Sequence, residues 1–187
     1  MSKGWLVGVV LLLSACSSTA PKTYYQLPLQ PATVAGKTDL TAARTLWLSH
    51  VSLADYLSTS GLVYQANDVR YVIASNNLWA SPLEQQLQQT LQSSLNAGLP
   101  GWTVSSQPLG AAPSELAVTV KAFHGRYDGK AVVQGEWTLQ RGDRLLRQPF
   151  SLVLPVNEDG YDALVKTLAQ GWQQVGLSIA AQIQRSE

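Results

Sequence analysis

The sequence is short of cysteine, of histidine and of charged side chains. Cys16 is its single cysteine, so no disulfide can form within the chain. Charged residues make up 13% of the chain, whereas a typical soluble domain has about 25%. Lys and Arg number 13 and Asp and Glu number 12, and they form no basic run. The composition therefore excludes a fold held by disulfides and gives no electrostatic sign of nucleic-acid binding.

The N-terminus carries the features of a secretory leader. One positive charge, Lys3, precedes an apolar run over residues 5–13 that is too short to span a bilayer. The run ends in Leu13-Ser14-Ala15-Cys16, which resembles the lipobox of bacterial lipoproteins. That resemblance implies a signal peptide over residues 1–15 and acylation of Cys16 with diacylglycerol and palmitate. The alternative is an ordinary signal peptide cut after Ala15, with Cys16 incidental.

The next residues predict a tether and a destination. Residues 16–23 are small and polar with one proline, and an extended chain from Cys16 to Thr23 reaches at most about 25 Å. Ser17 follows the cysteine, whereas aspartate at that position resembles an inner-membrane retention signal of bacterial lipoproteins. The resemblance therefore implies export to the outer membrane, with the protein on its periplasmic face.

Apolar and alternating runs in the rest of the chain predict strands. The expected strands are residues 24–27, 44–51, 61–65, 70–75, 101–106, 115–127, 130–140 and 144–156. Residues 66–69 form a good turn, so the third and fourth strands make a hairpin in which Tyr64 and Tyr71 lie near each other. The last three strands form a meander, because Asp128-Gly129 and Arg141-Gly142-Asp143 are turn sequences.

A first helix is predicted after Trp79, which we expect to pack into the core. Ser81 can cap this helix, Pro82 fits its first position, and Glu84 completes a capping box. Leucines recur every four residues from Leu83, so one side of the helix packs and the helix ends at Ala97, before Gly98.

The remaining side of that helix is polar but uncharged. Two interpretations are open, a solvated helix surface and a contact between subunits, because amides are buried at lower cost than charges. The candidate interface residues are Gln85, Gln86, Gln88, Gln89, Gln92 and Ser93.

A second helix is predicted over residues 161–184, where apolar residues follow the spacing i, i+3, i+4, i+7. Gly171 and Gly176 inside it favour close approach to a neighbouring element. The expected fold is α+β: one mostly antiparallel or mixed sheet with two amphipathic helices packed on one face. It forms a single domain over residues 24–187.

Catalytic motifs are missing. The chain has no G-x-S-x-G, no phosphate-binding glycine loop and no H-E-x-x-H. Its two histidines, His50 and His124, have no thiol beside them once Cys16 is acylated. We therefore expect no enzyme activity, no catalytic residue, no metal and no cofactor beyond the acyl groups on Cys16.

Several short segments together carry a family resemblance. They are the lipobox, Tyr24-Tyr25-Gln26-Leu27, Asp55-Tyr56-Leu57, Gly61-Leu62-Val63-Tyr64, Trp79-Ala80-Ser81-Pro82-Leu83, and the late strands with Phe123 and Trp137. In this order and spacing they resemble the ABC-type transport auxiliary lipoproteins, over nearly the whole mature chain.

The resemblance implies a non-enzymatic role in phospholipid transport between the inner and outer membranes. It implies that the chain receives the far end of a periplasm-spanning MCE-domain protein at the outer membrane. The low charge and the amide-rich helix side motivate the hypothesis that several copies form a homo-oligomer that matches such a partner by symmetry. Two alternatives remain, a direct periplasmic lipid-binding carrier and a lipoprotein regulator of envelope or cell-wall assembly.

Overall fold

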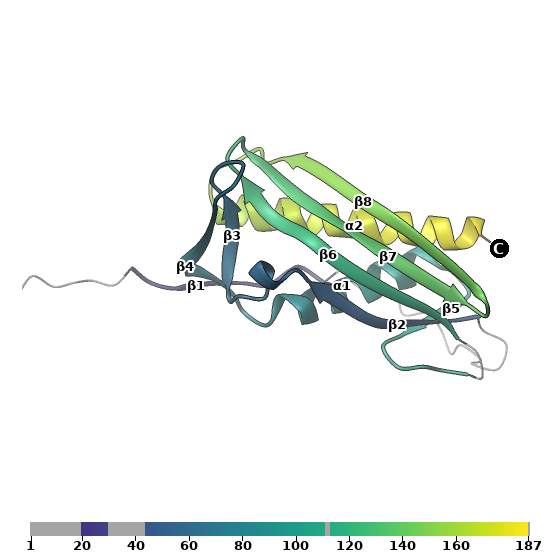
Figure 1. Ribbon diagram of the computed structural model, residues 1–187. Coiled ribbons are helices and arrows are strands. Elements are labelled where there is room, and N and C mark those ends of the chain that lie inside the picture. Colours follow the sequence, from purple (N-terminus) through teal and green to yellow (C-terminus); the bar gives the residue numbers. More distant parts are fainter. Residues whose placement is uncertain (1–19, 30–43, 111–112, 187) are drawn as a thin grey trace, which may run out of the picture.

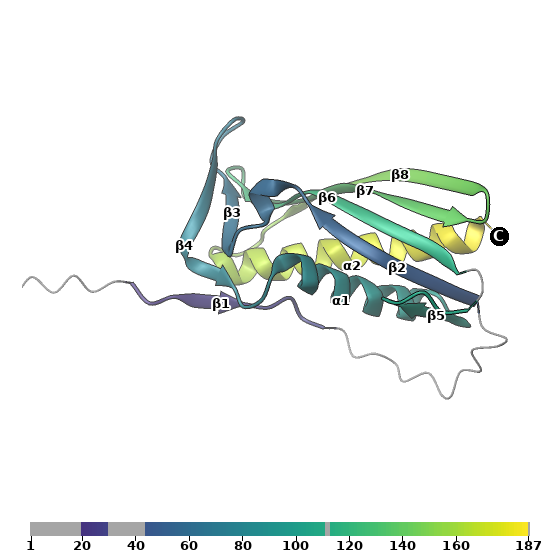
Figure 2. The ribbon, with the colours of Figure 1, turned by 60° about the horizontal axis from the view of Figure 1, so that its bottom comes forward.

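One eight-stranded sheet carries two helices on one of its faces (Figures 1 and 2). A computed structural model of the chain describes residues 20–29, 44–110 and 113–186. The predicted fold class, α+β with a single sheet, is confirmed.

The eight strands match the expected segments, with shifts at their ends. Their bounds are β1 Thr23–Tyr25, β2 Arg44–Leu53, β3 Gly61–Gln65, β4 Tyr71–Trp79, β5 Trp102–Ser105, β6 Ser114–Arg126, β7 Lys130–Arg141 and β8 Arg144–Pro155. A short 3-10 helix, η1 Asp55–Leu57, follows β2. The last three strands form the predicted antiparallel meander, and Gly129 and Gly142 both adopt the positive φ that their turns require.

Strand β6 is the centre of the sheet. One of its edges pairs with β7, and the other is shared by β2 along residues 114–120 and by β3 at residues 125–126. Between the two lies Lys121, an extra residue in the pairing with β7, whose carbonyl accepts a hydrogen bond of 2.8 Å from the Tyr56 hydroxyl. The chain therefore leaves this edge after β2 and returns to it as β3.

The sheet is mixed. Antiparallel pairs join β3 to β4, β6 to β7 and β7 to β8, while β1 and β4, β2 and β5, β2 and β6, and β3 and β6 are parallel. Parallel pairs need a crossover, and the chain between β2 and β6 includes one helix.

The helices α1 Leu83–Gly98 and α2 Tyr161–Arg185 run side by side in the same direction (Figure 2). The two glycines of α2 allow close packing, as predicted. A Cβ on Gly171 would lie 2.9 Å from Leu154 Cδ1, and one on Gly176 would lie 2.7 Å from the Ser94 Cβ of α1. Between helices and sheet lies an apolar core that includes Leu48, Leu87, Leu91, Leu116, Val118, Phe123, Val133, Trp137, Trp172 and Ile179.

The start of α1 differs from the prediction. Pro82 is the N-cap, because its carbonyl accepts hydrogen bonds from the backbone N–H groups of Gln85 and Gln86 at 3.0 and 3.2 Å. Ser81 makes no cap bond and donates instead to Gln26 Oε1 at 3.2 Å. Glu84 is exposed and forms no capping box. The backbone of Pro82 is extended, with ψ 128°, so the helix starts at Leu83, one residue later than expected.

Two aromatic positions near this helix also bear on the fold. Trp79 ends β4 and is buried, with its ring 6.2 Å from that of Phe123. Tyr64 and Tyr71 do not pair as expected, because Tyr64 lies opposite Val72 and Tyr71 lies opposite Gln65. Successive residues in a strand point to opposite faces, so the two tyrosines lie on different faces of the hairpin.

Candidate functional site

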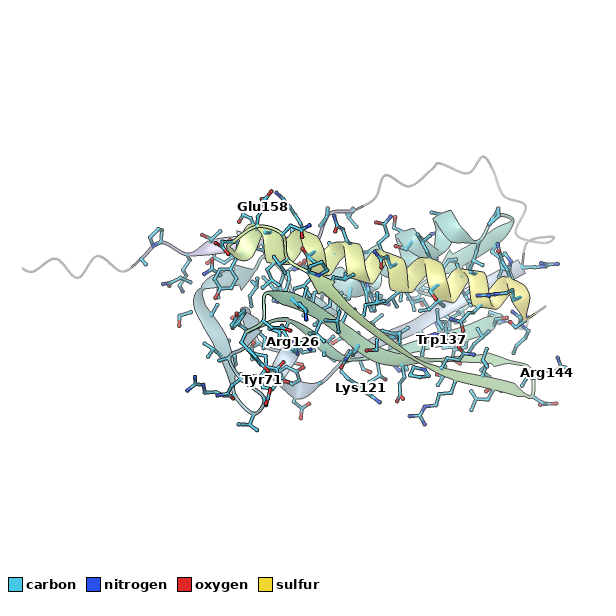
Figure 3. The ribbon with its side chains drawn as sticks, turned by 90° about the horizontal axis from the view of Figure 1, so that it is seen from above. Tyr71, Lys121, Arg126, Trp137, Arg144 and Glu158 are labelled. Carbon is cyan, nitrogen blue, oxygen red and sulfur yellow. The ribbon has the colours of Figure 1, made fainter. Side chains whose placement is uncertain are left out.

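The domain is elongated, and its two ends have different surfaces. At 1.5 Å per residue, the 25 residues of α2 span about 37 Å and run from one end to the other (Figure 1). We call the first end the hairpin end; it comprises β1, the β3–β4 hairpin and the β6–β7 turn. We call the second the arginine end; it comprises the start of β2, β5, the β7–β8 turn and the end of α2. Figure 3 shows Tyr71 and Arg126 near the first and Arg144 at the second.

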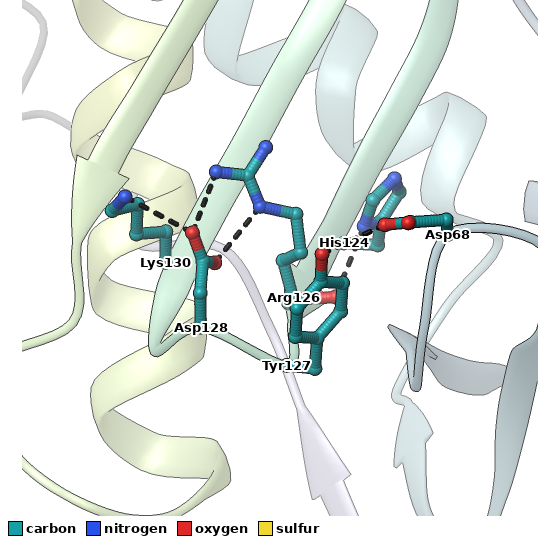
Figure 4. Close-up of polar contacts among 7 residues, drawn as sticks. Asp68, His124, Arg126, Tyr127, Asp128 and Lys130 are labelled. Atoms are coloured by element: carbon teal, nitrogen blue, oxygen red, sulfur yellow. Dashed lines mark hydrogen bonds and ion pairs between the residues drawn. The ribbon is translucent and has the colours of Figure 1, made fainter.

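Charged groups at the hairpin end are bonded to one another (Figure 4). Asp128 accepts hydrogen bonds of 2.8 Å from both Nε and Nη2 of Arg126, and Lys130 Nζ lies 3.0 Å away. The bonds from Arg126 hold the pKa of Asp128 well below its usual range. The Tyr127 hydroxyl donates to Asp68 Oδ1 at 2.7 Å, which joins the β6–β7 turn to the β3–β4 turn.

A buried histidine lies beside this network. His124 is only 2% exposed, and its ring lies 6.2 Å from that of Tyr56 and 5.2 Å from that of Tyr71. Its Nδ1 is 3.0 Å from the Gly125 carbonyl oxygen. Burial lowers the pKa of His124 and raises the pKa of Tyr56 to about 12. Both side chains are therefore neutral at pH 7, and both of their rings pack against the ring of Tyr71.

The outer rim of the hairpin exposes several apolar side chains beside the polar residues of its turn. Val69 in the turn is 89% exposed, and Val72 and Ile73 on β4 are 49% and 47% exposed. Strand β1 pairs only with Asn77–Trp79 of β4, so the earlier part of β4 has no strand on its outer side among the described residues. We call Val69, Tyr71, Val72 and Ile73 the apolar edge.

The arginine end gathers cationic side chains around one ring. The guanidinium carbons of Arg44 and Arg141 lie 5.8 and 5.6 Å from the centre of the Trp102 ring, within the range of cation–π attraction. Arg144 and Arg185 are exposed at the same end, and Asp143 lies in the β7–β8 turn. The ends of four strands, β2, β5, β7 and β8, and the end of α2 bring these residues together from distant parts of the sequence.

The amide-rich side of α1 is divided by the structure. Gln86 is fully buried; its Oε1 accepts from the Leu27 N–H and its Nε2 donates to the Ser81 carbonyl, both at 2.8 Å. Gln86 therefore does not belong to the outer face, and it is removed from the candidate interface. It fastens the segment after β1 to the start of α1.

The other amide positions differ in exposure. Gln85 and Gln89 are exposed, and Gln88 and Ser93 are half-buried. Gln92 is half-buried as well, and its Nε2 donates to the Val104 carbonyl on β5 at 3.1 Å. The surface available to a neighbouring subunit is thus smaller than predicted and is centred on Gln85 and Gln89.

The predicted anchor residues, Cys16 and Ser17, lie outside the described residues. The first described residue is Ala20, which leads into β1 at the hairpin end. The expected acylation and sorting therefore stay predictions.

Comparison with known proteins decides the family. The family model for the ABC-type transport auxiliary lipoprotein component matches residues 25–180. The chain belongs to this family.

Two curated relatives and two solved structures are similar to the chain. The chain is 51% identical over 188 aligned residues to the intermembrane transport lipoprotein PqiC of Escherichia coli K12, covering 98% of each chain, and it has the same identity to PqiC of Shigella flexneri. A crystal structure of an uncharacterized protein, 52% identical, superimposes with a TM-score of 0.79 over 87% of this chain and 99% of its own. A crystal structure from Xanthomonas campestris, 15% identical, has a TM-score of 0.64 over 88% of this chain and shares the fold.

The described residues contain neither a membrane-spanning helix nor a cluster of possible metal ligands. None of their helices is long and apolar enough to cross a membrane. Within the same residues, His, Cys, Asp and Glu side chains nowhere form a group of three that could hold a metal ion.

Proposed function

We propose that this transport auxiliary lipoprotein is acylated at Cys16, lies on the periplasmic face of the outer membrane and docks the MCE-domain protein PqiB there. In this position it forms the outer-membrane end of an intermembrane phospholipid transport system. The observation that carries the proposal is 51% identity over 98% of the chain to a protein named intermembrane transport lipoprotein.

The position of the tether supports this orientation. Thr23 begins β1 at the hairpin end, and the segment from Cys16 to Thr23 reaches at most about 25 Å. The arginine end lies about 37 Å further along α2. An acylated Cys16 therefore keeps the hairpin end near the membrane and directs the arginine end toward a partner that arrives from the periplasm.

The chemistry of the arginine end suits a protein partner with acidic side chains. Arginine forms bidentate bonds with carboxylates and is enriched in interface hot spots, as is tryptophan. Arg144 and Arg185 are exposed, and Trp102 is stabilised by the stacked guanidinium of Arg141. We propose that this end meets PqiB.

The copy number is a further part of the proposal. A hollow assembly of MCE domains presents repeated subunits, and a ring of lipoprotein copies matches it by symmetry. The exposed amides Gln85 and Gln89, with Gln88 beside them, are the proposed contact between copies.

Co-purification tests the docking. The mature chain, extracted from outer membranes in mild detergent, should retain PqiB, and the Arg144→Glu/Arg185→Glu variant should retain much less. Retention of PqiB at the wild-type level by this variant would exclude the arginine end as the docking surface. A wild-type chain that fails to retain PqiB would overturn the proposal itself.

Membrane fractionation tests the anchor and the destination. Cys16→Ser should release the protein into the soluble periplasmic fraction, and Ser17→Asp should move it to inner-membrane fractions. Unchanged fractionation of both variants would overturn the proposed acylation and sorting.

Native mass spectrometry tests the homo-oligomer. The wild-type protein should show several copies, and the variant Gln85→Glu/Gln89→Glu should show fewer.

A further inference from the structure

We infer that the apolar edge of the β3–β4 hairpin rests in the headgroup region of the lipid bilayer, so that the domain touches its membrane with β4 as well as with its acyl chains. The inference rests on the proposed acylation of Cys16 and goes beyond it, since it assigns the membrane-facing surface of the folded domain.

The apolar edge has a composition unlike that of a solvated strand edge. Val69 is 89% exposed in a turn, a place where polar residues are usual. Val72 and Ile73 follow on opposite faces of β4, each about half exposed, so both faces of the hairpin are apolar at its rim. Natural proteins normally protect such an edge with charges, proline or a covering element.

The tether brings lipid to this edge. In the sheet, Thr23 lies opposite Asn77, and Asn77 is six positions after Tyr71 on β4, a distance of about 20 Å. Cys16 is four residues before Ala20, the first described residue, a reach of at most about 14 Å. Figures 1 and 2 show β1 and β4 at the same end of the molecule. An acylated Cys16 thus places the bilayer within reach of the whole of β4.

The polar groups around the edge fit a membrane surface. The carboxylates of Asp68 and Asp128 are engaged by Tyr127, Arg126 and Lys130, so their charges are partly compensated. Arg70 is exposed between Val69 and Tyr71, and Lys22 is exposed just before β1; both carry the positive charge that attracts lipid phosphates. Tyr24 on β1 is exposed as well, and tyrosine is favoured at the interface between membrane and water.

A single reporter cysteine tests the inference. In the acylated full-length protein Cys16 has no free thiol, so Val72→Cys can be labelled alone with an environment-sensitive dye. The matched control is Leu145→Cys, since Leu145 is 67% exposed but lies at the arginine end. Both proteins are placed in vesicles of phosphatidylethanolamine and phosphatidylglycerol, with or without lipids that carry a nitroxide quencher.

The expected result is a blue shift and a severalfold loss of emission at position 72 with quencher lipid, and little change at position 145. Equal quenching at both positions, or none at either while the protein floats with the vesicles, would overturn the inference. A blue shift at 72 without quenching by lipid would identify a second protein copy as the occupant and also overturn it. Failure of the wild-type chain to float with vesicles would overturn the anchor, and with it the inference.

Discussion

The hairpin end and the arginine end use their charged side chains in opposite ways. At the hairpin end, Arg126 and Lys130 both bond Asp128, so cations and carboxylate compensate one another. At the arginine end, the guanidinium of Arg141 lies over the Trp102 ring, and Arg144 and Arg185 are exposed. The first arrangement leaves apolar side chains as the main means of contact, and the second leaves positive charge.

This difference explains how one small domain can serve two surfaces. A lipid bilayer accepts apolar side chains and tyrosine at its interface, whereas a protein partner is recognised by oriented charges and aromatic rings. The helix α2 joins the two ends, since Tyr25 bonds Asp162 in its first turn at 3.0 Å and Arg185 ends it. Substitutions in the core that joins the two ends, or at one end alone, test whether the ends act separately.

The largest effect is expected from Trp172→Ala. This substitution should destabilise the two ends together, because it removes packing from the core that joins them. Trp172 is buried in the middle of α2, packs on Phe123 and Phe150, and donates from Nε1 to the Leu87 carbonyl at 3.0 Å. Its loss should lower the free energy of unfolding by about 3–5 kcal/mol.

Hydrogen exchange at increasing denaturant measures this prediction, because it follows the amides of both ends separately. Leu177→Ala, a partly exposed position on the same helix, should change stability by less than about 1 kcal/mol. If the amides of β4 lost protection well before those of β7 and β8, the two ends would be separate cooperative units.

Gln86→Leu should produce the next largest effect, confined to the hairpin end. The substitution removes the acceptor of the buried Leu27 N–H and the donor to the Ser81 carbonyl, at a cost of about 1–3 kcal/mol. The control Gln174→Leu, at an exposed position of α2 outside the proposed contact between copies, should stay within about 0.5 kcal/mol. Urea denaturation of the two variants measures the difference, and equal stabilities would show that the Gln86 bonds contribute nothing.

Gln86 also shows what the sequence could have revealed about the site. It follows Leu83 by three residues and precedes Thr90 by four, so it lies on the buried side of the helix that the leucine spacing had already identified. Amide side chains are usually exposed, so Gln86 was predicted to lie on the polar side of the helix. The need for an acceptor came from Leu27, on a distant segment, which periodicity does not detect.

Predictions of the elements succeeded where local signals were strong. The meander strands agree with the structure within about one residue, because Asp128-Gly129 and Gly142 mark their turns. Strand β4 was expected to end at Ser75 but continues to Trp79, since β1 pairs with its polar end. The pattern within a strand gives its faces and not its neighbours, so the parallel pairs and the grouping of Arg44, Trp102 and Arg141 could not be read from it.

Reversing charge at the arginine end should weaken partner binding without affecting the fold. The variant Arg144→Glu/Arg185→Glu should bind PqiB about tenfold more weakly at low salt, mainly through a slower association rate, and the difference should shrink at high salt. The control Arg70→Glu reverses an exposed charge at the hairpin end and should leave binding unchanged. Surface plasmon resonance at two salt concentrations measures the affinity of both variants for PqiB. An equal loss of affinity in both would show that PqiB binding is not specific to the arginine end.

The smallest expected effect is a pH dependence that belongs to the hairpin end alone. Burial lowers the pKa of His124 below its ordinary value of about 6.5, and the nearby charge of Arg126 lowers it as well. The rings of Tyr56 and Tyr71 and the Gly125 carbonyl also lie close to it. Above pH 6.5 the ring is neutral in both states. As the pH falls below this value the unfolded chain binds a proton that the folded chain resists, so stability is lost, by at most about 1.4 kcal/mol per pH unit. Urea titrations at pH 7.5 and 5.5 measure this effect. Between these pH values the free energy of unfolding should fall less for His124→Phe than for the wild type. Equal falls for the two proteins would show that His124 does not cause the pH dependence.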